Sequence, residues 1–133
     1  MTKPQETHSV HTSEALTRAY AEGKRSFSGI SLANENLKSA DLKGADLSYA
    51  DLSDSDLCGA NLRGIDLSYA VLQNTNLSNT DMQGTILIGA DLRDATLDRA
   101  NLRNAVYSPQ ETLFPEGFDP LNADMKSDRA AEG

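Results

Sequence analysis

The most constraining feature of this chain is a large residue, nearly always leucine, at every fifth position of its central segment. The series begins at Phe27, runs from Leu32 to Leu102 without a break, and closes at Tyr107. A period of five fits neither an α-helix, with about 3.6 residues per turn, nor a strand, whose side chains alternate between two faces. It fits a chain that turns a corner after each short extended segment.

The residues around each large residue indicate how such a segment is built. Alanine is common two positions before it and Asp or Asn one position before it, as in Ala45-Asp46-Leu47. Because side chains alternate along extended backbone, the alanine and the leucine are expected to point inward and the Asp or Asn outward. The next two residues are rich in corner-forming Gly, Asn, Asp and Ser. Four corners would close a coil of about 20 residues, and stacked coils would bury a core that one coil cannot.

Composition narrows the class of function. The 133 residues carry a formal net charge of -8, which disfavours electrostatic binding to nucleic acid or to anionic lipid. Cys58 is the single cysteine, so no disulfide can form within the chain. The polar first residues lack a signal-peptide core, and no apolar run is long enough to span a membrane. We therefore expect a cytoplasmic protein that binds neither nucleic acid nor membrane.

Four segments are expected along the chain. In order, they are a disordered tail (1–12), an N-terminal capping helix (13–23), the repeat block (24–108) and an irregular C-terminal cap with a tail (109–133). Ser13 is suited to N-cap the helix, and Gly23 to follow its end. Pro109, Pro115 and Pro120 interrupt regular structure in the last segment.

The repeat resembles a known family. The motifs ADLKG, ADLSY, ADLSD, ANLRG, ADLRD and ANLRN stand in order within residues 26–108. They resemble the A(D/N)LXX motif of pentapeptide-repeat proteins, and the flanks YAEGKRSFSG (20–29) and TLFPEGFDP (112–120) resemble those of short free-standing cyanobacterial members. The resemblance implies an all-β fold, a right-handed quadrilateral β-helix of about four coils, with no cofactor and a role in protein–protein contact. Some members of that family protect DNA gyrase by imitating DNA.

A candidate binding surface emerges when the repeat is aligned in steps of one coil. Tyr49 and Tyr69 fall at the same corner and are expected to stack. Outward positions that are elsewhere polar hold Ile86, Ile88 and Val106. Exposed apolar residues at such positions favour a contact surface. The six candidate partner-binding residues are Tyr49, Tyr69, Val71, Ile86, Ile88 and Val106.

Two interpretations of this patch remain open. In the first, the C-terminal segment folds back and covers it through Leu113, Phe114 or Phe118. In the second, the patch is a partner or dimer surface, with Asp46 and Asp66 forming an acidic rim.

Some inward positions break the pattern. Glu35 takes an inward position in the first coil, where it is expected either to reach the coil edge and meet Lys24 or Arg25, or to mark an irregular corner. Buried hydroxyls need backbone acceptors. The inward hydroxyl residues are Thr75, Thr80 and Thr85.

Metal and catalytic sites find little support. A line of oxygen-bearing corner residues is formed by Asn34, Asp54, Asn74 and Asp94. Corners favour such residues in any case, and calcium needs six or more converging oxygens. His8 and His11 fall in the expected tail, and Cys58 has no activating neighbour that the sequence reveals. We expect no metal, no cofactor and no enzymatic activity.

The leading hypothesis is a non-catalytic protein–protein interaction module. It would be a rigid acidic rod that binds a protein partner in a regulatory or scaffolding role, as a monomer or weak homodimer. The alternative is binding to DNA gyrase by DNA mimicry, which the acidic charge favours. Four coils spaced by about 4.8 Å give a rod of only about 20 Å, which counts against the alternative. The chain also lacks the extra loops and dimerisation end of the gyrase-protecting members.

Overall fold

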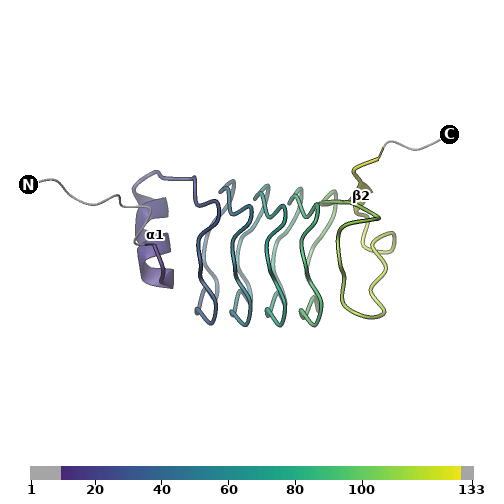
Figure 1. The fold of residues 1–133 in the computed structure, drawn as a ribbon, viewed down its shortest axis with the longest axis horizontal. Helices are drawn as coiled ribbons and strands as arrows, with labels where there is room; N and C mark the ends of the chain where they lie inside the picture. Colours follow the sequence, from purple (N-terminus) through teal and green to yellow (C-terminus); the bar gives the residue numbers. More distant parts are fainter. Residues whose placement is uncertain (1–9, 130–133) are drawn as a thin grey trace, which may run out of the picture.

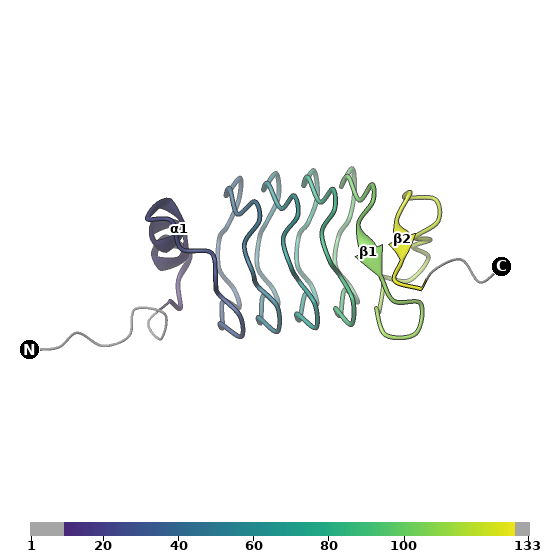
Figure 2. The ribbon, with the colours of Figure 1, turned by 90° about the horizontal axis from the view of Figure 1, so that it is seen from above.

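The structure, a computed structural model, describes residues 10–129 and is a β-helix of stacked coils (Figure 1). Parallel β-bridges join residues 20 apart, such as Asp46 to Asp66 and Asp66 to Ile86. Helix α1 (Ser13–Ala21) lies at one end of the stack, and strands β1 (Val106–Tyr107) and β2 (Lys126–Ser127) lie at the other (Figure 2). The repeat thus folds into the β-helix that the five-residue period indicates.

The coil presents four outward faces, which repeat along the stack with this register. The first face contains 41–44, 61–64, 81–84 and 101–104, and the second contains 26–29, 46–49, 66–69, 86–89 and 106–109. The third contains 31–34, 51–54, 71–74 and 91–94, and the fourth contains 36–39, 56–59, 76–79 and 96–99. From Gly29 to Asn104, each of these segments ends at a corner residue with positive φ, such as Tyr49 (62°), Tyr69 (59°) and Arg99 (59°). The turn is closed by a backbone bond such as Ala50 N–H to Leu47 O, 3.1 Å, which is the pattern of a type II turn.

The interior is filled by the inward side chains. The leucines of the repeat from Leu32 to Leu92 are buried without exception. The expectation that inward hydroxyls find backbone acceptors is confirmed: Thr75 Oγ1 donates to Leu52 O at 2.9 Å, and Thr85 Oγ1 to Leu62 O at 2.7 Å. These two hydroxyls reach the preceding coil and tie neighbouring coils together, whereas Thr80 Oγ1 donates within its own coil to Leu77 O at 2.7 Å.

The outward Asp and Asn side chains have a structural task. The Oδ1 atom of each accepts a hydrogen bond from the backbone N–H two residues later, as Asp46 does from Ser48 N at 3.0 Å and Asp66 from Ser68 N at 2.9 Å. Such Asx bonds satisfy a backbone donor at the corner locally. The residues that make this bond within the repeat are Asn36, Asp41, Asp46, Asp51, Asp56, Asn61, Asp66, Asn76, Asp81, Asp91 and Asn101.

Helix α1 begins one residue earlier than its predicted cap implies. The N-cap is Thr12, whose Oγ1 accepts from Ala15 N at 3.1 Å, and not Ser13. The Ser13 N–H instead donates to Glu35 Oε1 at 2.7 Å. The helix buries Leu16 against the first coil. Val10, expected within a polar tail, is also buried and belongs to the same hydrophobic core as Leu16. The rest of that expected tail, residues 1–9, lies outside the described residues.

Glu35 therefore contacts the helix rather than the predicted Lys24 or Arg25. Its carboxylate accepts the first N–H of α1, where the helix dipole is positive. Its backbone N–H donates to Ser55 Oγ at 3.0 Å, and that hydroxyl donates to Leu32 O at 2.7 Å. The corner before Glu35 is thus bridged by a serine hydroxyl, which is the irregular corner that the sequence indicated.

The C-terminal segment returns to the coil register. Val106 in β1 pairs in parallel with Lys126 in β2, again 20 residues away. Asp124 supplies a corner with φ of 59°, and Met125 fills an inward position. Leu113 pairs with Asp91, 22 residues away, so the coil holds two extra residues before Leu113. The segment from Leu113 to Lys126 is two residues shorter than the repeat would give, so the 20-residue spacing returns at β2. The segment expected to be irregular therefore contributes a further, partly regular coil.

Candidate functional site

The two tyrosines of the candidate surface stack, as the repeat predicts. The ring centroids of Tyr49 and Tyr69 lie 5.3 Å apart, and the rings are inclined by 13°. The Tyr49 side chain is 63% exposed and that of Tyr69 42%. The difference arises because the Tyr69 ring has a neighbour on each of its faces, Tyr49 on one and Gly89 on the other.

The second neighbour of Tyr69 is a glycine corner. A Cβ atom added to Gly89 would lie 2.3 Å from Cε1 of the Tyr69 ring, so only glycine allows this ring to lie on the corner. The Tyr69 hydroxyl donates to Glu111 Oε1 at 2.9 Å. This hydrogen bond, and secondly the negative charge of Glu111, raise the pKa of Tyr69 above its ordinary value of 10.0. The Tyr69 ring is therefore held in place at both its face and its hydroxyl.

The aliphatic members of the patch lie on the second and third faces. Ile86 pairs with Asp66 on one side and Val106 on the other, so the outward residues change from acidic to apolar along the second face. Ile88 follows Ile86 towards the Gly89 corner. Val71 lies on the third face between Asp51 and Asp91. The four aliphatic side chains are half-buried, whereas the two tyrosines are exposed.

The C-terminal segment does not cover the tyrosine corner. Phe114 lies edge-on to Tyr107, with 5.7 Å between the ring centroids, and stacks on Phe118, with 4.9 Å. Leu113 continues the third face beyond Asp91 and is exposed. The aromatic residues of this segment thus extend the core at the end of the stack, and the contact with the tyrosines is made by Glu111.

The tyrosine side of the patch has acidic surroundings, while Lys126 pairs with Val106 at its other end. Arg93 is the basic residue among 46–54, 66–74 and 86–94, and its guanidinium binds Asp91 through Nε–Oδ1 at 2.9 Å and Nη2–Oδ2 at 2.8 Å. These bonds lower the pKa of Asp91. The acidic residues of the same three segments are Asp46, Asp51, Asp54, Asp66, Asp91 and Asp94.

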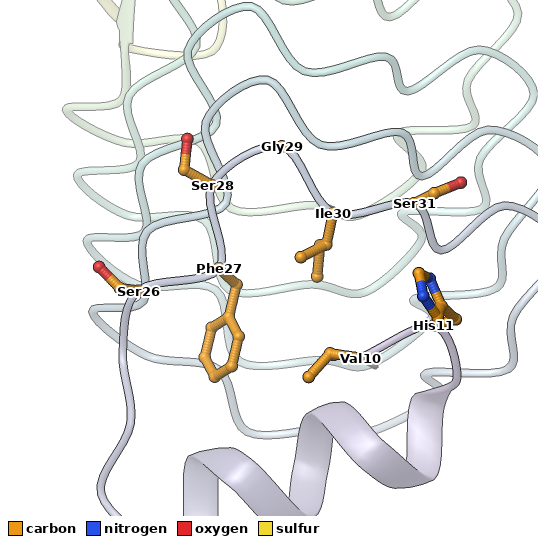
Figure 3. Close-up of a pocket in the computed structure, with 8 residues that line it drawn as sticks. All are labelled: Val10, His11, Ser26, Phe27, Ser28, Gly29, Ile30 and Ser31. Carbon is orange, nitrogen blue, oxygen red and sulfur yellow. The ribbon is translucent and has the colours of Figure 1, made fainter. Parts of the chain in front are cut away.

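A cleft of about 370 Å³ lies between the first coil and the residues before α1 (Figure 3). Phe27 and Ile30 point from the coil towards Val10, while Ser26, Ser28 and Ser31 lie along the coil. His11 is the titratable residue of its lining, so an acid–base pair is not formed there. A second hollow, of about 480 Å³, lies between 95–98 and 115–118 on the fourth face.

Other candidate residues stay apart from one another. Within residues 10–129 no group of three or more His, Cys, Asp or Glu side chains is placed to hold a metal ion. Cys58 is half-buried, with Asn79 Nδ2 4.0 Å from its Sγ, and His11 is exposed; His8 lies outside the described residues. No helix in this part of the chain has the length and apolar character needed to cross a membrane.

Sequence reasoning found the tyrosine stack and the aliphatic residues but missed Gly89 and Glu111. Gly89 stands at a corner position, where glycine is common, and only the ring lying on it gives it a further role. Glu111 lies beyond the repeat, where no period predicts its position. The Asx role of the acidic residues was also missed, although the constant place of Asp or Asn before each leucine could have indicated it.

Three of the solved structures that the chain matches are of cyanobacterial proteins. It is similar to alr5209, a pentapeptide repeat protein from Nostoc PCC 7120, with a TM-score of 0.87, 44% identity, and coverage of 89% of this chain and 97% of that one. Rfr23 from Cyanothece 51142 matches with a TM-score of 0.38 and 26% identity over 77% of this chain and 64% of that one. HetL, involved in heterocyst differentiation regulation in Nostoc sp. PCC 7120, matches with a TM-score of 0.38 and 31% identity over 78% of this chain and 56% of that one.

The family comparison agrees with the geometry. No curated protein matches the sequence. The family model for pentapeptide repeats matches residues 26–64 and 65–104, with 8 copies of the repeat. These are the residues that build the coils, with leucine inward, Asp or Asn outward and a type II corner in each five. With coils, corners and matches in agreement, the chain belongs to the pentapeptide-repeat family.

Proposed function

We propose that this protein is a non-catalytic binding module, a rigid acidic rod whose second face docks a protein partner in a regulatory or scaffolding role. One observation carries the proposal. At positions where the repeat places an Asx hydrogen bond, Ile86 and Val106 have no oxygen with which to make it. Each such replacement gives up a hydrogen bond of about 1 kcal/mol and leaves half-buried methyl groups at the surface. The coil architecture does not require this exchange, so contact with another molecule explains it better.

The rigidity of the rod supports the same conclusion. Every coil is bonded to the next through a backbone ladder, and most of its corners are tied by Asx bonds. A surface that is already ordered loses little conformational entropy on binding. The stacked Tyr49 and Tyr69 add aromatic area, which dominates the energy of many interfaces.

The chemistry of the surface suggests the type of partner. Acidic residues surround the apolar centre, so a basic protein surface is complementary to it. We place the protein in the cytoplasm, as a monomer or weak homodimer that binds neither nucleic acid nor membrane. In this proposal α1 and the C-terminal coil cap the stack, because uncovered strand edges at the ends of a solenoid promote aggregation.

Binding to DNA gyrase by DNA mimicry is the second candidate, and the acidic second and third faces favour it. The first face counts against it, because Lys43, Arg63 and Arg103 interrupt the negative charge there. The carboxylates also serve the corners through Asx bonds, so their abundance has a structural cause. A DNA supercoiling assay with purified gyrase separates the two: inhibition by this protein would favour the mimic.

The double substitution Tyr49→Ala with Tyr69→Ala tests the leading proposal. Both rings lie outside the core, so the melting temperature should change little. A partner captured from a source lysate and then purified should bind the variant at least about tenfold more weakly than the wild type. Arg63→Ala with Arg103→Ala, on the first face, is the matched control and should keep its affinity. Equal affinities for wild type and tyrosine variant would remove the patch from the proposal.

A further inference from the structure

We infer that the open face of the Tyr49 ring is a subsite for an arginine side chain of the partner. The inference rests on the proposed function and specifies which residue of a basic partner the patch selects. It begins with the corner that ends the second face, where successive coils carry Gly29, Tyr49, Tyr69 and Gly89. Two aromatic rings are thus enclosed between two glycines, and the two ends of this column differ.

The Tyr69 end of the column is closed. The ring leans onto the corner of the following coil, where it occupies the space that a Gly89 side chain would need. Tyr49 covers its other face, and Glu111 holds its hydroxyl. No further planar group can enter the stack at this end.

The Tyr49 end of the column is open. Because successive corners superpose, a third ring stacked on Tyr49 would have to come from residue 29, which is a glycine. A Cβ atom added to Gly29 would meet nothing within 4 Å. Tyr49 is also the more exposed ring, at 63% against 42% for Tyr69. The column therefore leaves the outer face of the Tyr49 ring free for a planar group supplied by another molecule.

Charge selects a cation for this place. Asp46 precedes Tyr49 on the second face and Asp51 follows it on the third. In each carboxylate Oδ1 is engaged by a serine, with Ser48 N and Oγ on Asp46 and Ser53 N and Oγ on Asp51. Among the hydrogen bonds of residues 10–129, none uses the Oδ2 atom of either Asp46 or Asp51. The two residues that flank the Tyr49 corner in sequence thus each keep one carboxylate oxygen without a hydrogen bond.

A guanidinium fits these two features together. It is planar, stacks on aromatic rings and donates several hydrogen bonds in its own plane, whereas an ammonium is a point charge. The chain itself shows the arrangement elsewhere: Arg25 lies over the Tyr20 ring, 3.7 Å from its centroid, and donates to Tyr20 O at 2.9 Å. The outward residues of the first coil that pair with Asp46 and Asp51 are Ser26 and Ser31. Arg25 precedes Ser26, and its guanidinium is engaged with Tyr20.

The test uses short peptide amides of arginine, lysine and citrulline with the full-length protein. Citrulline keeps the shape of arginine without its charge. Binding is followed by calorimetry and by NMR of the tyrosine rings, of which the chain has 4. We expect the arginine peptide to bind at least about fivefold more tightly than the lysine peptide, the citrulline peptide to bind more weakly still, and Tyr49 ring signals to shift. Equal binding of arginine and lysine would reduce the site to simple charge attraction and overturn the inference.

Filling the place is the sharper experiment. Gly29→Tyr should extend the stack and block the subsite, and the corner accepts tyrosine because Tyr49 and Tyr69 have φ of 62° and 59°. Gly44→Tyr is the matched control, at a first-face corner with φ of 74° and equally open space. We expect Gly29→Tyr to abolish the preference for arginine and Gly44→Tyr to keep it. Both melting temperatures should fall by a similar small amount, because a side chain at positive φ costs about 1–2 kcal/mol. Unchanged arginine binding in Gly29→Tyr would overturn the subsite, while loss of partner binding in the tyrosine double variant would still support the proposed function.

Discussion

The first and second faces share one backbone but differ in what they display. On the first face every rung from Asp41 to Asn101 makes the Asx bond. On the second face the bond is made by two rungs and is then replaced by isoleucine and valine. The backbone hydrogen bonds are the same on both faces: Leu62 N–H to Asp81 O and Leu67 N–H to Ile86 O both measure 2.8 Å. Inward residues and corners therefore define the fold, and an outward Asp or Asn can be exchanged for an apolar residue without loss of the ladder.

The largest expected effect comes from placing a charge on the inward side. Leu67 is buried on the second face, so Leu67→Asp would leave a carboxylate without a partner inside the stack. We expect a loss of more than about 4 kcal/mol in the free energy of unfolding, enough to prevent folding. Circular dichroism during heating measures it, and a variant that melts with the wild type would contradict the inward assignment.

Ile86→Asp is the matched control on the same face. It makes a similar chemical change at an outward rung and should regain the Asx bond to residue 88. We expect its free energy of unfolding to equal that of the wild type or to exceed it by about 0.5–1 kcal/mol. A destabilisation comparable to that of Leu67→Asp would mean that outward residues also define the fold.

A smaller effect is expected where α1 meets the first coil. Glu35→Ala removes the acceptor of the Ser13 N–H at the start of the helix. Loss of such a cap should lower the free energy of unfolding by about 1–2 kcal/mol, measured by denaturant titration. Glu35→Gln keeps an oxygen at this position and should lose less. Identical stability of Glu35→Ala and the wild type would show that α1 is held by its apolar contacts alone.

The smallest effect concerns the tyrosine corner and alkaline pH. Because the hydrogen bond and charge of Glu111 raise the pKa of Tyr69 above 10.0, the stabilising contact is fully present below that pH. It is lost as pH rises through the pKa of Tyr69 in the folded state, since phenolate cannot donate to the carboxylate. In Glu111→Gln, the absorbance of the phenolate should appear at lower pH than in the wild type. Superimposable titration curves would show that this contact is absent in solution.

The sequence predicted the coil, its inward leucines and the tyrosine stack because each depends on a period that the chain repeats many times. The features that it missed depend on contacts that occur only once in the described fold. Ser13 and Thr12 can both accept a helix N–H, and only the position of Glu35 in the folded chain decides between them. The return of 124–127 to the ladder was missed because Met125 replaces the alanine of the motif and Ser127 the leucine.

The 20-residue register has a consequence for how such a chain can change length. Inserting five residues between Tyr49 and Tyr69 would rotate every later side chain by a quarter of a circuit. Ile86 would move to a different face, and Tyr69 would no longer lie at the same corner as Tyr49. Inserting a whole circuit would lengthen the rod and leave each later residue on its own side. The two extra residues before Leu113 are compensated by a segment two residues shorter between Leu113 and Lys126. The 20-residue spacing is therefore kept even where the motif has ended. Insertions and deletions in this molecule are therefore expected to be tolerated according to the phase they leave behind rather than to their size.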